Sequence, residues 1–118
     1  NFEFPSSFDN KIIILSMEEY WLNKNRVLKK LDSYIDESKD IYLSIDIDVL
    51  DPSVFDSVSY PIIGGFQMND FLGIISKILC SDKVYFCDIV EYNPMVGSDN
   101  AHIFYQIIQF VKSKLRRI

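Results

Sequence analysis

Short apolar runs alternate with longer amphipathic stretches along this chain, and this alternation constrains the fold more than any other feature. The runs cover residues 11–16, 41–47 and 84–90, and each has the length and the β-branched character of a strand. Such nearly continuous apolar runs predict strands covered on both faces, as in parallel sheets.

The stretches between and after these runs carry apolar residues at helical spacing. They cover residues 17–35, 71–79 and about 99–115, and the Asn23-Lys24-Asn25 sequence interrupts the first of them. Strands that alternate with helices predict an α/β fold in which right-handed crossovers connect parallel strands and helices lie on both faces of the sheet.

Composition excludes several classes of protein. The chain has 118 residues, 48% of them hydrophobic, which is enough for the core of one small domain. A net charge of −5 argues against a nucleic-acid partner, and no apolar run reaches the roughly 20 residues that span a bilayer. The two cysteines, Cys80 and Cys87, lack the spacing of a disulfide-stapled domain or a zinc site, so we expect a cytoplasmic protein with reduced thiols.

Acidic residues follow the second and third apolar runs directly. If the strand continues through Asp46 and Asp48, their side chains leave the same face, close enough to share a divalent cation. Two adjacent carboxylates repel unless a positive charge separates them. The alternative is a solvated strand end whose acids form turns, and for Asp51, before Pro52, we predict such a loop-stiffening role.

A long irregular segment, residues 49–65, follows the first two acids and contains Pro52, Pro61, Gly64 and Gly65. A loop of this length in a compact domain is usually functional. Because ligands bind at the carboxyl ends of parallel strands, we expect Asp46, Asp48 and Glu91 to form one site there.

Three motifs carry a family resemblance. Ser44-Ile45-Asp46-Ile47-Asp48-Val49-Leu50-Asp51-Pro52, then Gly64-Gly65, then Asp88-Ile89-Val90-Glu91-Tyr92-Asn93-Pro94 resemble the carboxyl-terminal signature series of the ureohydrolases, the arginase and agmatinase superfamily. The similarity runs from about residue 12 to residue 115. It implies a three-layer α/β/α arginase-like fold, with residues 1–118 as the carboxyl-terminal part of a single domain.

The resemblance also implies a chemistry. Members of the family use two Mn²⁺ ions to activate a bridging hydroxide, which attacks the guanidinium carbon and releases urea or an analogous product. Asp46 matches the carboxylate that bridges the two metals, Asp48 matches one that binds a single metal, and Glu91 resembles the acid that holds the cationic group of the substrate. The implied partners are a small guanidino or amidino substrate and, as in relatives, further copies of the chain in a homo-oligomer.

Departures from the family pattern qualify this expectation. Two earlier motifs rich in His and Asp are missing, and we read the sole histidine, His102, as a surface or packing residue. No catalytic residue is therefore assigned, and we expect these 118 residues to be inactive alone, as a portion of a longer chain. The loop before Gly64 also lacks the usual Pro-Glu pair.

Two other functions stay open at this point. One is a truncated or degenerate, non-catalytic ureohydrolase-like subunit, and the other is a manganese-dependent glycosyltransferase with an Asp-x-Asp motif, which leaves residues 88–94 unexplained. Among hydrolase substrates, arginine, agmatine, guanidinobutyrate and formiminoglutamate all remain open.

Overall fold

A computed structural model describes residues 12–115, and the contacts within the chain define two units, residues 1–32 and residues 33–118. In the first unit, helix α2 (Met17–Leu22) begins after Ser16, whose hydroxyl accepts a 3.1 Å hydrogen bond from the amide of Glu19. The helix ends at Asn23, whose side chain in turn accepts a 3.1 Å hydrogen bond from the amide of Arg26. Helix α3 (Lys24–Glu37) follows, so the predicted interruption at Asn23 is confirmed.

The strand predicted for residues 11–16 is not present among the described residues, which exclude Lys11. Residues 12–16 adopt no regular secondary structure, and Ile12, Ile13 and Ile14 are exposed. A β-branched apolar run becomes a strand only when a neighbouring strand satisfies its backbone groups. In residues 12–115, β1 and β2 pair only with each other, so this run has no partner.

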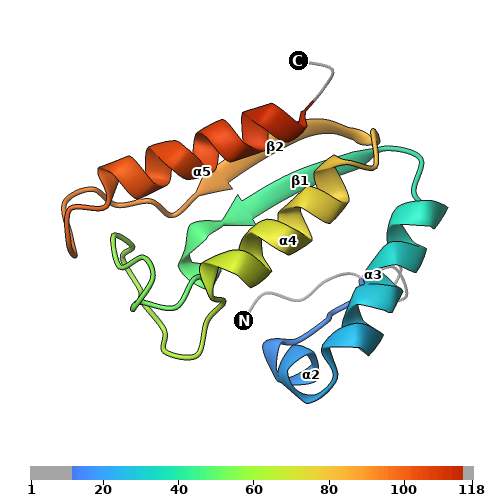
Figure 1. Ribbon diagram of the computed structural model, residues 1–118, viewed down its shortest axis with the longest axis horizontal. Coiled ribbons are helices and arrows are strands. Elements are labelled where there is room, and N and C mark those ends of the chain that lie inside the picture. Colours follow the sequence, from blue (N-terminus) through green and yellow to red (C-terminus); the bar gives the residue numbers. More distant parts are fainter. Residues whose placement is uncertain (1–11, 116–118) are drawn as a thin grey trace. The chain divides into compact units, whose positions relative to one another are not determined.

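The second unit contains a parallel pair of strands, as predicted (Figure 1). Strand β1 (Ile41–Asp46) lies beside β2 (Val84–Val90), with Tyr42 opposite Phe86, Ser44 opposite Asp88 and Asp46 opposite Val90. The crossover between them contains helix α4 (Met68–Leu79), and helix α5 (Ala101–Lys114) follows β2. The predicted order of strand, helix, strand and helix from residue 41 onward is therefore confirmed.

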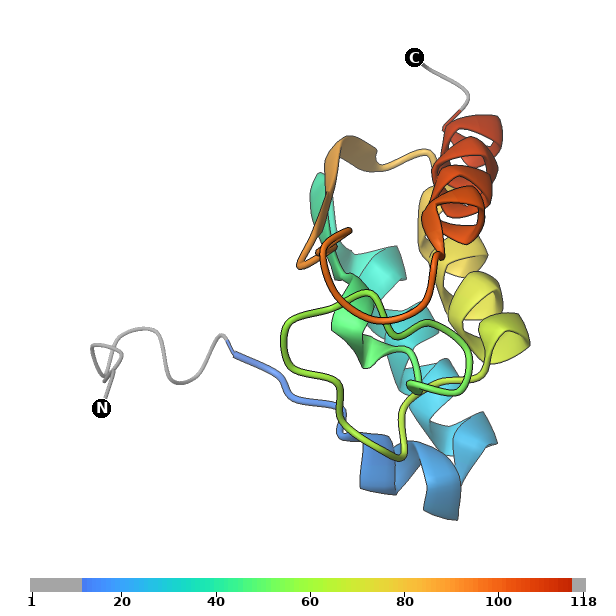
Figure 2. The same ribbon diagram turned by 90° about the vertical axis from the view of Figure 1, so that its left-hand side faces the viewer.

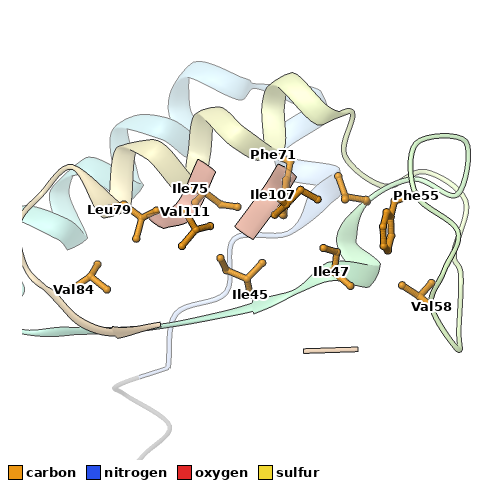
Figure 3. Packing of buried hydrophobic residues seen from close by; sticks show 11 residues of the cluster. Ile45, Ile47, Phe55, Val58, Phe71, Ile75, Leu79, Val84, Ile107 and Val111 are labelled. Carbon is orange, nitrogen blue, oxygen red and sulfur yellow. The ribbon is translucent and has the colours of Figure 1, made fainter. Parts of the chain in front are cut away.

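Helices α4 and α5 lie on the same face of the two-stranded sheet (Figure 2). The buried side chains of α4 recur every four residues, at Phe71, Ile75 and Leu79, and so form one stripe. They pack with side chains of β1 and α5 in a single core (Figure 3), whose members include Ile45, Ile47, Phe55, Val58, Ile107 and Val111. Burial of each such side chain contributes about 1.5–3 kcal/mol.

The face of the sheet turned away from α4 and α5 carries aromatic and polar side chains. Tyr42 and Phe86 are about half exposed there, and their rings stack with centroids 5.1 Å apart. Within residues 12–115, no helix combines the length and the apolar composition that crossing a membrane requires.

Candidate functional site

Three acids gather at the carboxyl edge of the sheet. Asp46 is the last residue of β1, Asp48 lies in the short 3-10 helix η1 (Ile47–Val49), and Glu91 follows the last residue of β2. Because Asp46 pairs with Val90 in the parallel register, Glu91 comes next at the same edge. The sequence predicted this common location.

Asp46 and Asp48 meet through a turn, because β1 ends at Asp46. The predicted shared face required a strand that continues through both residues, and this condition is not met. The chain leaves the extended conformation after Asp46, whose Oδ1 accepts a 3.2 Å hydrogen bond from the amide of Asp48. Ile47 and Leu50 are fully buried, and their spacing of three residues suits a 3-10 turn with both side chains in the core. The spacing of Ile47 and Leu50 is therefore the feature of the sequence that could have predicted this turn.

The electrostatics of the site centre on Asp48. A hydrogen bond with the Asp46 side chain, partial burial and the negative charges of Asp46 and Glu91 together raise the pKa of Asp48 to about 6. Such a rise is the expected response of a carboxyl group with anionic neighbours.

A divalent cation would relieve this repulsion, and carboxylate oxygens suit hard cations such as Mg²⁺ and Mn²⁺. The two aspartates therefore fit part of a metal site. In the part of the chain that the structure describes, no group of three or more His, Cys, Asp or Glu side chains converges closely enough to hold a metal ion. For such an ion the pair would supply an incomplete set of ligands, and the remaining ligands would come from water, substrate or another segment.

Asp51 fastens the loop that follows the acids, in agreement with its predicted role. Its Oδ1 accepts a 2.9 Å hydrogen bond from the amide of Gly64, and its Oδ2 accepts from the amide and the hydroxyl of Ser53. These donors, led by the Ser53 hydroxyl, lower the pKa of Asp51 to about 2. Asp51 is thus bonded within the loop rather than directed to a metal.

The paired glycines close the same loop. Gly64 has a φ of 94°, in the left-handed region that favours glycine. At Gly65 a Cβ atom would lie 2.5 Å from the carbonyl oxygen of Val49 and 2.6 Å from the amide nitrogen of Asp51. Phe66 then bridges to Leu50, so the backbone packs directly behind the turn that carries Asp48.

A second set of contacts, which was not predicted from the sequence, joins this loop to the segment after Glu91. Asp56 accepts hydrogen bonds from the amide of Ser98 at 2.8 Å and from the side chain of Asn100 at 2.7 Å. The buried hydroxyl of Ser57 donates to the carbonyl of Ser98 at 2.8 Å. These pairs lie about forty residues apart in the sequence, and no local pattern marks them.

Glu91 itself is exposed and has an unusual backbone. Its φ of 73° lies in the left-handed region, where a residue with a Cβ atom pays about 1–2 kcal/mol. His102 is exposed on α5, which agrees with its interpretation as a surface residue. The free thiol of Cys87 is half-buried, whereas that of Cys80 is exposed.

Comparisons with known proteins agree with the resemblance. A model of the arginase family matches residues 3–111. A formimidoylglutamase of Aeromonas salmonicida is 40% identical over 74 residues, which cover 63% of this chain and 24% of the relative. A formimidoylglutamase of Aeromonas hydrophila is 34% identical over 89 residues, covering 70% of this chain and 28% of the relative. The chain therefore spans about a quarter of the length of these relatives.

Solved structures share the fold. An arginase from Bacillus subtilis has a TM-score of 0.76 at 21% identity, covering 98% of this chain and 41% of that one. The formimidoylglutamase of Bacillus subtilis subsp. subtilis has a TM-score of 0.71 at 21% identity, covering 98% and 39%. These likenesses confirm the predicted arginase-like α/β fold class.

Proposed function

Because this chain belongs to the arginase family, we propose that the complete protein is a metal-dependent hydrolase of a guanidino or amidino C–N bond. One observation carries the proposal: Asp46, Asp48 and Glu91 lie at one edge of the sheet, and the charges of Asp46 and Glu91 act on Asp48. Family membership also argues against the glycosyltransferase alternative.

We assign Asp46 and Asp48 as ligands of Mn²⁺, with two ions in the complete enzyme. The chemistry that such ions supply when bound is the activation of water at neutral pH. Glu91 is exposed beyond the end of β2, where its carboxylate can accept two parallel N–H bonds from a planar amidinium or guanidinium cation. Hydrolysis of the cationic group forms a bond between the oxygen of water and the amidine carbon and breaks the C–N bond to the departing nitrogen. Both protons of water end on that nitrogen, which leaves as an ammonium group.

An N-formimino amino acid is the substrate class that we propose first. Two curated relatives that match this chain in sequence, at 40% identity over 74 residues and 34% over 89 residues, are both formimidoylglutamases. Hydrolysis of a formimino group releases formamide, and hydrolysis of a guanidino group releases urea, so the products separate the two classes.

The non-catalytic alternative is supported by one observation: within residues 12–115 no group of three or more possible metal ligands comes together. A subunit with only two aspartates would bind Mn²⁺ weakly and would hydrolyse little. We propose that the 118 residues alone behave in this way, whereas a complete chain with further His and Asp ligands is active.

The experiment supplies Mn²⁺ and N-formimino-glutamate, arginine or agmatine to the 118-residue chain and to the longest natural form of the protein. We expect formamide from the first substrate with the longest form, and little product from the 118 residues. A longest form that binds Mn²⁺ but releases neither formamide nor urea would support the non-catalytic subunit instead.

The proposed assembly is a homo-oligomer in the cytoplasm. Exposed apolar side chains at the tip of the loop after β1 support self-association, since Tyr60, Ile62 and Ile63 are between 69% and 90% exposed. Analytical ultracentrifugation of the longest form tests this assembly, and a monomer across micromolar concentrations would contradict it.

A further inference from the structure

The backbone changes its pairing partner at Glu91. On one side of this residue, Val90 pairs with Asp46 in the parallel ladder between β1 and β2. On the other side, Tyr92 pairs with Val58 in an isolated antiparallel bridge, so the chain near Ser59 runs beside Glu91. Glu91 is the single residue between these two arrangements, and its φ is 73°.

A left-handed conformation at a residue other than glycine persists only where its surroundings hold it. Val90 is held by the ladder on one side. Tyr92 is held on the other side, because its ring stacks on that of Phe104 with centroids 4.0 Å apart and an interplanar angle of 17°. These contacts fix both neighbours of Glu91 but leave open what fixes the chain direction after Tyr92.

Asn93 fixes that direction with its backbone and with both ends of its side chain. Its amide donates to the carbonyl of the buried Ser57 at 2.8 Å. Its Nδ2 donates to the hydroxyl of Ser59 at 3.1 Å, and its Oδ1 accepts from the amide of Met95 at 3.0 Å. The side chain therefore joins the loop after β1 to the turn that follows Glu91.

We propose that Asn93 is a positioning residue that holds the backbone of Glu91 in the left-handed conformation and thereby directs its carboxylate to the edge where Asp48 lies. The inference rests on the proposed substrate-binding role of Glu91 for its functional meaning. Its structural content is independent of that role, because it concerns the backbone conformation of Glu91 and the direction that this conformation gives to the side chain.

The test is NMR spectroscopy of the full 118-residue chain. A positive φ places the amide proton of Glu91 close to its own Hα, so the NOE within the residue is strong in the wild-type chain. Asn93→Ala removes both side-chain bonds, and Asn93→Asp keeps only the acceptor for Met95. Ser59→Ala removes the acceptor on the opposite loop. We expect all three variants to weaken this NOE, Asn93→Ala the most.

Asn100→Ala is the matched control. It also removes an asparagine side-chain bond between the two loops, the 2.7 Å bond to Asp56, but it lies nine positions from Glu91 in sequence. We expect it to leave the NOE of Glu91 unchanged. If Asn93→Ala does not fold, as judged from the remaining amide resonances, the milder Ser59→Ala decides the outcome.

Titration with acetamidinium, followed at the Glu91 resonances, separates this inference from the proposed function. If Asn93→Ala shifts most molecules out of the left-handed conformation, we expect apparent affinity to fall about tenfold, in proportion to the competent population. A strong NOE retained in both folded Asn93→Ala and Ser59→Ala would overturn the positioning role. A weakened NOE with no acetamidinium binding even in the wild-type chain would support that role and count against the proposed function of Glu91.

Discussion

The hydroxyl of Ser44 on β1 donates a 2.6 Å hydrogen bond to Oδ1 of Asp88, which lies directly opposite it on β2. The Tyr42 hydroxyl donates to the other oxygen of the same carboxylate. These bonds, with that of Ser44 the larger influence, lower the pKa of Asp88. The contact ties the two strands together two residues before Asp46, and so helps to set the register that aligns the acids.

Ser44→Ala is expected to raise the pKa of Asp88 toward the ordinary value of 3.8, because it removes the main donor that stabilises the ionised form. The pKa can be followed by NMR titration of the side-chain carboxyl carbon. Ser53→Ala removes a hydroxyl donor from Asp51 instead and is the control. A pKa of Asp88 that is equally low in Ser44→Ala would contradict the role of this bond.

The stability of the fold is expected to fall in acid through Asp51. Its pKa in the folded chain is about 2, below the ordinary 3.8, so its stabilising effect is complete above about pH 4 and is lost as the pH falls toward 2. Asp51→Asn should therefore lower stability at pH 7 and flatten its dependence on pH between 4 and 2. Urea unfolding at several pH values measures both, with the exposed Asp40→Asn as the control.

Gly65→Ala is expected to destabilise the second unit by about 1–3 kcal/mol, the usual cost of overpacking. The added Cβ would lie within 2.7 Å of the backbone of the turn that carries Asp48. Gly73→Ala in α4 is the matched control, since nothing lies within 4 Å of its Cβ position. That change should stabilise the helix by about 0.5–1 kcal/mol. Equal effects of the two changes on urea unfolding would rule out the close approach at Gly65.

Manganese binding is expected to depend on both aspartates and on pH. Protonated Asp48 is a poor ligand, and its pKa is about 6, so binding should strengthen as the pH rises from 5 to 7. Asp46→Asn and Asp48→Asn should each weaken binding about tenfold or more, the scale expected for loss of 1.4 kcal/mol of ligand interaction. Electron paramagnetic resonance of free Mn²⁺ measures the affinity. Asp82→Asn, at the turn before β2, serves as the control, and a similar affinity in all variants would place the metal elsewhere.

Local patterns predicted the helices well. The four-residue spacing of Phe71, Ile75 and Leu79 is a property of the sequence alone, and the helix follows because one stripe can face a core. The interruption at Asn23 was visible for a similar reason, since its side chain competes for backbone amides. The role of Asp51 in the loop was also predicted from its turn chemistry.

The failures involve residues whose conformation depends on distant partners. The run at residues 12–15 has strand-forming side chains, but no strand pairs with it in residues 12–115. The predicted strand over residues 41–47 ends one residue earlier, at Asp46, where a 3-10 turn that buries Ile47 and Leu50 begins. Intrinsic β-propensity predicts neither outcome. It indicates which structure a segment can form, whereas contacts with other segments decide which structure it adopts.

By itself, the sequence determined where apolar runs end in acids, which stretches become helices and to which family the chain belongs. Only the tertiary structure decided that Asp46 and Asp48 meet through a turn, that Glu91 adopts a positive φ, and that Asp56 joins Ser98. The physical reason is the separation along the sequence over which each interaction acts. Periodicity and turn chemistry act over a few residues, whereas the geometry of the site depends on hydrogen bonds and packing between segments about forty residues apart.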